Sequence, residues 1–244
     1  MAATQDPAAL YPDIATEGSL ASALQAVADR NGLSVSFTVS EADPLRAASV
    51  TSAAPRRTVM AINAWAVERR WSIRGCESFQ DLPLVEGHTE ELAQIVQAAH
   101  AWHRGEQLTA VREVAPFVHL TGRFEVADHD PARLTESEWQ HLLTEAREVD
   151  WPEYRALIEA AYAEPALRRL YPFTSHWTLR FSTSTRPRLT VVRLCLAAHR
   201  QKPFAVSTDM MGEGLAEAAT AEEAVAIAAG RLPCDLGPVT LGAG

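Results

Sequence analysis

The period of the apolar residues changes from about 3.6 residues to 2 residues in the middle of this chain. This change most strongly constrains what the segment can fold into. Two stripes at helical spacing come first: Trp139, Leu142, Leu143, Ala146 and Val149, then Tyr154, Leu157, Ile158, Ala161 and Tyr162. Pro152 separates them, because the residue before a proline avoids helical dihedral angles. Thr135 and Glu138 have the spacing of a capping box at the first helix start. We therefore predict a helical hairpin.

From Ser175 the apolar period becomes two, which is typical of a half-buried strand. The apolar set is Trp177, Leu179 and Phe181, and the polar set is His176, Thr178, Arg180 and Ser182. Residues 192–198 alternate in the same way, and residues 204–207 have the length of a third strand. This pattern predicts an antiparallel meander with one core face and one polar face.

The order of strands followed by a helix occurs twice, at about residues 33–102 and 175–229. We therefore predict an α+β fold of two antiparallel-sheet-plus-helix units, joined by the central helical hairpin. The expected division is an N-terminal α+β unit at 1–115, the hairpin at 116–170, and a C-terminal β-meander plus helix at 171–244. One compact domain overall remains an alternative. A pseudo-repeat is possible because two expected helices start with similar strings. These are Thr89-Glu-Glu-Leu-Ala and Ala221-Glu-Glu-Ala-Val.

The charge of the chain is unevenly distributed. The net charge of −9 argues against general affinity for nucleic acid. Residues 165–208 contain no Asp or Glu but eight basic residues: Arg168, Arg169, Arg180, Arg186, Arg188, Arg193, Arg200 and Lys202. One reading is internal charge balance with the carboxylates of residues 125–153. The other is a binding face for an anionic small molecule, a carrier protein or a precursor peptide.

Composition also indicates the compartment. No run of about 18 apolar residues occurs, so we expect no membrane partner, and residues 1–11 lack the pattern of a secretory signal. The cysteines at 76, 195 and 234 are scattered and form no C-x-x-C pair. Such an arrangement favours reduced thiols in a cytoplasmic protein over a disulfide framework.

No familiar cofactor or metal motif is present. The sequence lacks a phosphate-binding G-x-x-x-x-G-K, a G-x-S-x-G and an H-E-x-x-H. His100 and His103 have a spacing that could suit a metal, but no third ligand is evident. We therefore expect no cofactor and no metal.

His176 is the main candidate for acid/base chemistry. The alternation predicts that Thr178, Arg180 and Ser182 share its strand face, where they could hold an anion while His176 moves a proton. Arg193, on the polar face of the next predicted strand, is a further candidate for binding the anion.

Two other histidines are also candidates for acid/base chemistry. His119 and Arg123 precede the hairpin and could reach the same cleft, as a catalytic and a substrate-binding residue respectively. His129 lies between Asp128 and Asp130, which is typical either of a carboxylate-oriented base or of a polar turn.

Several strings resemble a family of uncharacterised actinobacterial proteins that are labelled only "natural product biosynthesis protein". They are Arg69-Arg-Trp-Ser-Ile-Arg-Gly75, Pro116-Phe-Val-His-Leu-Thr-Gly122, Asp130-Pro-Ala-Arg-Leu-Thr-Glu-Ser-Glu-Trp139 and Tyr171-Pro-Phe-Thr-Ser-His-Trp-Thr-Leu-Arg-Phe181. The resemblance implies a cytoplasmic role near secondary-metabolite pathways and brings no catalytic residues with it.

Three functions follow as hypotheses. The first is an accessory protein of such a pathway that binds an anionic partner through a basic sheet face. The second is a cofactor-independent acid/base enzyme, such as a cyclase, isomerase or hydrolase. The third is a protein-interaction or immunity-type module. An enzyme needs its histidines and arginines to converge in a closed pocket, whereas a binder needs an open basic face. The sequence does not predict an oligomeric state.

Overall fold

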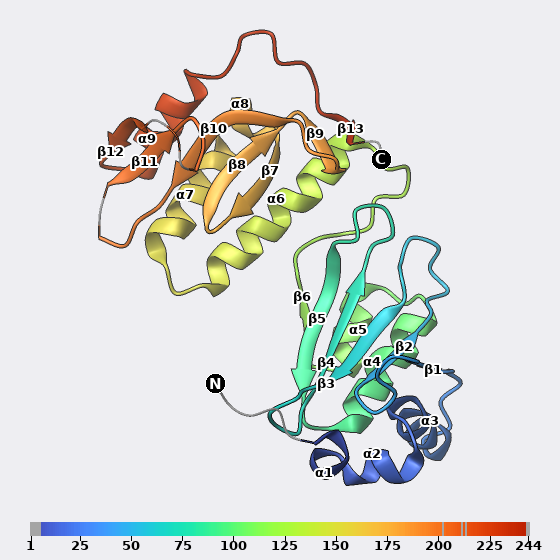
Figure 1. Ribbon diagram of the computed structural model, residues 1–244. Helices are drawn as coiled ribbons and strands as arrows, with labels where there is room; N and C mark the ends of the chain where they lie inside the picture. Colours follow the sequence, from blue (N-terminus) through green and yellow to red (C-terminus); the bar gives the residue numbers. More distant parts are fainter. Residues whose placement is uncertain (1–5, 202, 211, 213, 243–244) are drawn as a thin grey trace. The chain divides into compact units, whose positions relative to one another are not determined.

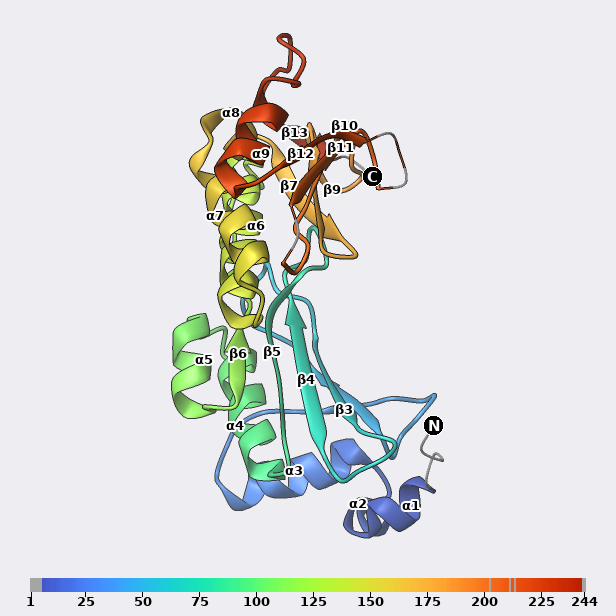
Figure 2. The ribbon, with the colours of Figure 1, turned by 90° about the vertical axis from the view of Figure 1, so that its left-hand side faces the viewer.

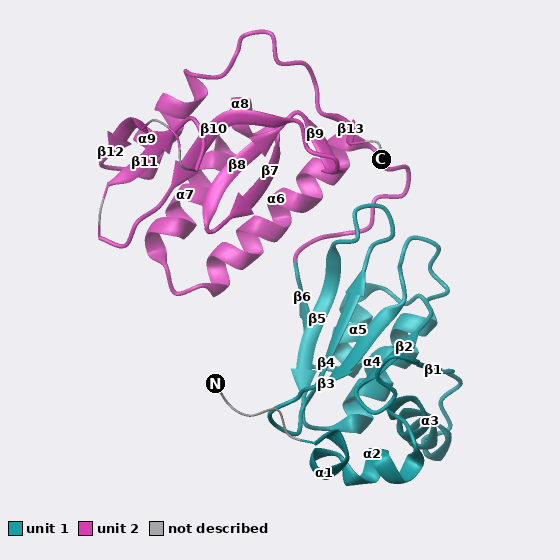
Figure 3. Cartoon of the chain, in the orientation of Figure 1, with its two compact units in different colours: residues 1–121 teal, residues 122–244 magenta. Residues whose placement is uncertain are grey.

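The chain folds into two compact units, residues 1–121 (unit 1) and residues 122–244 (unit 2) (Figure 3). The computed structural model describes residues 6–201, 203–210, 212 and 214–242. Each unit combines helices with an antiparallel sheet (Figure 1), which confirms the α+β class. The pseudo-repeat stays a prediction. Residues 116–121 cluster with unit 1, and the predicted helical hairpin belongs to unit 2.

Unit 1 is a six-stranded meander in which the strands lie in sequence order. The strands are β1 (Thr38–Val39), β2 (Ala47–Val50), β3 (Met60–Ala64), β4 (Trp71–Cys76), β5 (Pro83–Thr89) and β6 (Val118–Leu120). The helices are α1 (Pro7–Leu10), α2 (Pro12–Glu17), α3 (Leu20–Arg30), α4 (Leu92–His103) and α5 (Leu108–Val114). The side chains of α3 and α4 share one core with alternate residues of the strands.

A glycine allows helix α4 to pack close to the sheet of unit 1. The Trp102 ring on α4 packs directly over Gly75 of β4, where a Cβ atom would lie only 2.7 Å from the ring. The indole N–H of Trp102 donates to the Thr58 carbonyl oxygen at 3.3 Å, and the Arg57 guanidinium lies 4.7 Å from the ring centroid. A side chain at position 75 would therefore force α4 away from the sheet.

Unit 2 holds a second antiparallel sheet, in the strand order β12-β11-β10-β8-β7. Its strands are β7 (Tyr171–Ser175), β8 (Thr178–Ser182), β10 (Val191–Ala197), β11 (Phe204–Ser207) and β12 (Gly214–Ala218). A separate parallel pair joins β9 (Ser184–Pro187) and β13 (Thr240–Gly242). The helices are α6 (Pro131–Glu148), α7 (Pro152–Ala163), α8 (Pro165–Arg168) and α9 (Ala221–Ala229). Figure 2 shows α6, α7 and α9 on one side of this sheet, where their apolar stripes share its core.

The capping box predicted at Thr135 and Glu138 is wrong, whereas a related cap occurs at the start of α9. At α9 the Glu223 N–H donates to Thr220 Oγ1 at 3.1 Å, and Glu223 Oε2 accepts from the Ala219 N–H at 2.9 Å. Helix α6 instead begins at Pro131 and is capped by Asp130, which accepts from the Arg133 N–H at 2.8 Å. Proline is favoured in a first turn, so the helix starts one turn before the capping-box spacing suggested.

The prediction of a strand from Ser175 is also wrong at its start. Strand β8 begins at Thr178, and His176 and Trp177 form the two-residue turn that joins it to β7. Both turn residues have positive φ angles, +50° and +64°, which a tight hairpin of this kind requires. The apolar alternation continued through the turn, so the sequence pattern did not reveal it.

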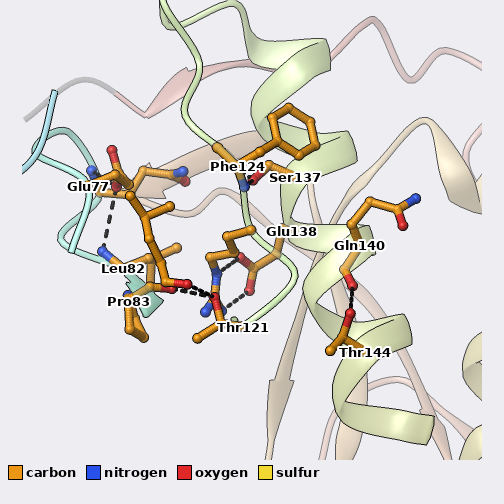
Figure 4. A network of polar contacts seen from close by, with 12 residues as sticks. Glu77, Leu82, Pro83, Thr121, Phe124, Ser137, Glu138, Gln140 and Thr144 are labelled. Carbon is orange, nitrogen blue, oxygen red and sulfur yellow. Dashed lines mark hydrogen bonds and ion pairs between the residues drawn. The ribbon is translucent and has the colours of Figure 1, made fainter. Parts of the chain in front are cut away.

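A buried ion pair fixes the start of unit 2 to α6. The guanidinium of Arg123 donates to both Glu138 oxygens, at 2.7 and 2.9 Å, and the two side chains are only 8% and 5% exposed. Next to it, the Ser137 hydroxyl accepts from the Phe124 N–H and lies 3.1 Å from the Phe124 carbonyl oxygen (Figure 4). Arg123, which the sequence suggested as a substrate-binding residue, has a structural role here. Glu138 serves this ion pair rather than a capping box.

No helix among the described residues has the length and apolar character needed to cross a membrane.

The ion pair generates a stability prediction. Replacing Glu138 with leucine leaves the Arg123 charge buried without its carboxylate and should cost about 3–5 kcal/mol of unfolding free energy in unit 2. The double variant Arg123→Met/Glu138→Leu should lose much less, because no unpaired charge remains. Urea unfolding of the full chain, with amide hydrogen exchange in α6 to assign the transition, measures both variants.

The exposed pair of Arg155 and Glu159 on α7 is the matched control. Glu159→Ala should cost about 1 kcal/mol or less, because solvent screens the pair. Equal losses for Glu138→Leu and Glu159→Ala would show that burial does not make the first pair important.

Candidate functional site

A hollow of about 650 Å³ in unit 2 lies where the start of α6, helix α8 and the segment before β13 meet. We call it the α8 hollow. Its lining is mostly apolar, with three charged side chains: Ala132, Thr135, Glu136, Pro165, Arg168, Arg169, Leu236, Gly237, Pro238 and Val239. This volume falls in the range of small-molecule sites, and an apolar wall with a few polar groups is typical of them.

Glu136 anchors the polar side of the α8 hollow. Its carboxylate accepts from the Tyr162 hydroxyl at 2.6 Å, from Gln140 Nε2 at 2.8 Å and from Arg168 Nη2 at 3.1 Å. The Arg168 guanidinium also lies over the Tyr162 ring, 4.2 Å from its centroid. Glu136 and Gln140 are one helical turn apart on α6, so both side chains reach the Tyr162 hydroxyl on α7. These contacts hold Arg168 in place.

The same contacts set the protonation of the two acidic groups. Burial raises the pKa of the Glu136 carboxyl group, but hydrogen bonds from Tyr162, Gln140 and Arg168 outweigh burial and keep the pKa below its ordinary value of 4.5. The pKa of the Tyr162 hydroxyl is raised, first by burial and then by its hydrogen bond to Glu136. Glu136 is therefore charged at neutral pH, which makes it a poor general acid.

Arg169 differs from its neighbour Arg168. It is exposed, it lines the α8 hollow, and its side chain makes no ion pair or hydrogen bond with any residue that the structure describes. With Arg168 and Glu136 it gives the hollow a net charge of about +1. The site thus offers an apolar wall beside a guanidinium that is available to an anionic group.

The three histidines proposed for catalysis lie on three separate elements. His119 is on β6 in unit 1. His129 lies in the loop before α6, with a positive φ of +52°. His176 is exposed in the turn between β7 and β8 and does not share a strand face with Thr178. Its ring Nδ1 is 3.3 Å from the Ser175 hydroxyl. Their catalytic roles stay predictions.

Three of the residues proposed to bind substrate lie on the sheet face turned away from the helices. Thr178 and Arg180 alternate on β8 with buried Leu179, and Arg193 alternates on β10 with buried Leu194. The Arg180 guanidinium lies 5.3 Å from the Phe173 ring centroid. An anion site on this face stays a prediction.

Ser182 and Cys195 are both buried. Ser182 is 0% exposed, and its hydroxyl lies 2.7 Å from the Ser184 carbonyl oxygen and 3.0 Å from that of Thr190. The expectation that Ser182 binds substrate is therefore corrected, because its hydroxyl ties the β8–β10 connection together. Burial raises the pKa of the Cys195 thiol more than the neighbouring Arg180 charge lowers it, so the thiol is not an activated nucleophile.

Some of the basic segment contacts the carboxylate-rich segment. Arg168 pairs with Glu136, and Arg200 donates to the Asp150 carbonyl oxygen at 2.6 Å. Lys202 lies outside the described residues. Sequence reasoning included Arg168 and Arg169 in the basic segment but did not single out Glu136 or Tyr162. The i, i+4 spacing of Glu136 and Gln140 was the available signal for a polar stripe on α6.

Comparison with known protein families gives a match for one part of the chain. Residues 133–243 match a family of unknown function, DUF6193. This range covers most of unit 2 and, apart from Ala132, every residue that lines the α8 hollow. Neither a curated protein nor a solved structure matches the chain.

Within the described part of the chain, no cluster of three or more His, Cys, Asp or Glu side chains could hold a metal ion. The polar side chains that line the α8 hollow are the guanidinium groups of Arg168 and Arg169, the carboxylate of Glu136 and the hydroxyl of Thr135.

The lowered pKa of Glu136 predicts a pH-dependent contribution to stability. A carboxyl group with a lowered pKa in the folded protein stabilises it above the ordinary value of 4.5, and this contribution is lost as the pH falls through the folded-state pKa. The stability difference between the parent and Glu136→Gln should therefore be largest near neutral pH and shrink below about pH 4.5. Urea unfolding between pH 7 and pH 3 measures it.

Tyr162→Phe provides the second measurement. Removing this hydroxyl takes one hydrogen bond from Glu136, so the carboxyl pKa should rise toward its ordinary value. Carbon-13 NMR titration of the Glu136 carboxyl group follows this directly. An unchanged titration midpoint would show that Tyr162 does not hold the carboxylate.

Proposed function

We propose that this protein is a non-catalytic binding protein that holds an amphipathic anion in the α8 hollow of unit 2. One observation carries the proposal: Arg169 is an exposed arginine without a partner among the described residues, and it adjoins an apolar wall. A carboxylate or phosphate on Arg169 would place a short apolar chain against Pro165, Leu236 and Val239. Each half of such a ligand meets a group of matching character.

The size of the hollow favours a small molecule over the other partners. A volume of about 650 Å³ suits a ligand with a short chain. A carrier protein or precursor peptide would engage a larger surface, and only its acyl arm or one side chain would enter. We therefore take a free organic acid as the ligand.

The resemblance to proteins labelled for natural product biosynthesis supports a place near a secondary-metabolite pathway. Three free cysteines, two of them buried, support a reducing compartment such as the cytoplasm.

Binding is favoured over acid/base catalysis for a structural reason. The candidate histidines lie on separate elements, and the carboxylate in the α8 hollow is held charged by three donors. A general acid or base needs a pKa near the working pH and a proton within reach. Glu136 instead orients Arg168, which is a positioning role.

The experiment compares three ligands that separate the two halves of the site. Isothermal titration of the full chain uses octanoate, octanol and acetate. Octanoate should bind more tightly than either of the others, because only it has both a chain and a charge. Arg169→Gln should weaken octanoate binding about tenfold or more, to the level of octanol, since hydrogen bonds to charged groups contribute roughly 1.5–3 kcal/mol.

Two further variants locate the site. Arg188→Gln removes an exposed arginine of the same basic segment and should leave octanoate binding unchanged. Arg180→Gln tests the sheet face. A loss with Arg180→Gln but not with Arg169→Gln would move the site to the sheet, and equal binding of octanol and octanoate would remove the role of the anion.

A further inference from the structure

Unit 1 has a hollow of its own, of about 620 Å³, on the sheet face that points away from α3 and α4. We call it the sheet hollow. It is lined by Asn63, Ser72, Ile73, Arg74, Glu86, Gly87, His88, Phe117 and His119. These residues come from four adjacent strands and the residue before β6, so the sheet itself holds their backbones in register. The hollow lies outside the family match.

The polar residues of the sheet hollow form two rows across the strands. Asn63, Ser72 and His88 are successive cross-strand partners. In the second row Arg74 lies opposite Glu86, and Glu86 lies opposite His119. Cross-strand partners point to the same face with their Cβ atoms about 5 Å apart. A cation and a carboxylate are therefore neighbours on an uncovered face.

Arg74 and Glu86 do not pair with each other. Both are exposed, and neither forms an ion pair within 4.0 Å with any side chain in the described ranges. The hydrogen bond of Arg74 runs from Nε to the Cys76 sulfur at 3.4 Å, which leaves the terminal nitrogens of the guanidinium for another partner. Opposite charges placed directly across a ladder normally attract. Here both charged ends remain available at the hollow.

An aromatic side lies next to these charges. Phe117, which is half-buried and also packs against the core of unit 1, lines the sheet hollow. His88 packs against Trp65 with ring centroids 5.6 Å apart, and the Arg70 guanidinium lies 4.9 Å from the Trp65 ring centroid. This stack restrains His88 at the edge of the hollow. The site combines a forked cation, a carboxylate and an aromatic ring.

We propose that the sheet hollow binds the zwitterion of an aromatic α-amino acid, with its carboxylate on Arg74, its ammonium on Glu86 and its ring against Phe117. A simple anion would be repelled by Glu86 and a simple cation by Arg74, whereas a zwitterion satisfies both. The guanidinium fork matches a carboxylate in geometry as well as charge. This site does not depend on the function proposed for unit 2.

The test uses L-phenylalanine, N-acetyl-L-phenylalanine and L-phenylalaninamide with the full chain. Isothermal titration should give L-phenylalanine a Kd of about 1 mM or tighter. Each capped derivative should bind at least about tenfold more weakly, because each lacks one of the two charges. Absence of saturation with L-phenylalanine at about 10 mM, or a capped derivative that binds as tightly as L-phenylalanine, overturns the proposal.

Two variants assign each charge to its residue. In Arg74→Gln, L-phenylalanine and its amide should bind equally, because the carboxylate has lost its partner. In Glu86→Gln, L-phenylalanine and its N-acetyl form should bind equally. A variant that weakens all three compounds by the same factor contradicts the assignment of that residue. Both positions are exposed, so the variants should keep the circular dichroism spectrum of the parent.

Two controls separate this site from general effects and from unit 2. Arg112→Gln changes an exposed arginine on α5 and should leave L-phenylalanine binding unchanged. Arg169→Gln should also leave it unchanged, and a loss there would place the amino acid in the α8 hollow instead. Glycine should bind about tenfold more weakly than L-phenylalanine, and equal affinity would remove the role of Phe117.

Discussion

One-sided coverage of the sheets is the constraint on which the rest of this structure depends. In each unit the core helices pack on one face, so alternate strand residues are buried and the residues between them face away. Ile73 and Arg74 illustrate this in unit 1, and Leu179 and Arg180 in unit 2. Each unit thus gains a core from half of its strand residues. The other half remains free to carry polar groups, and the sheet hollow is built from them.

The basic segment was interpreted either as internal charge balance or as a binding face for an anion, and different residues of the segment fit each interpretation. Arg168 pairs with the Glu136 carboxylate on α6, and Arg200 donates to the Asp150 carbonyl oxygen just after α6. Part of the positive charge is therefore balanced by the helical hairpin. Arg169 follows Arg168 directly and has no such partner among the residues described. Successive residues at the end of a short helix point in different directions. Charge balance and an available cation can therefore arise from one dipeptide.

Local signals predicted local structure well. The two apolar stripes of the predicted helical hairpin correspond to the observed helices α6 and α7. The α+β class followed from the change of period. The predictions that were wrong concerned residues whose positions depend on partners distant in sequence or on turn geometry. Arg123 is buried because Glu138, fifteen residues later, reaches it. His176 lies in a turn because its φ is positive, which the apolar alternation does not encode.

The candidate sites show the same limit. The basic segment indicated where a cation for the α8 hollow would be found, but its apolar wall comes from residues 236–239, which no local pattern connects to α8. The family match covers this wall, Glu136 and Arg169 together, whereas the sheet hollow lies wholly outside the matched range. The α8 hollow is therefore the site that relatives matched over residues 133–243 could share. Such a relative would need both an arginine at the position of Arg169 and an apolar segment before β13, because either half alone would bind an amphipathic acid more weakly than the two halves together.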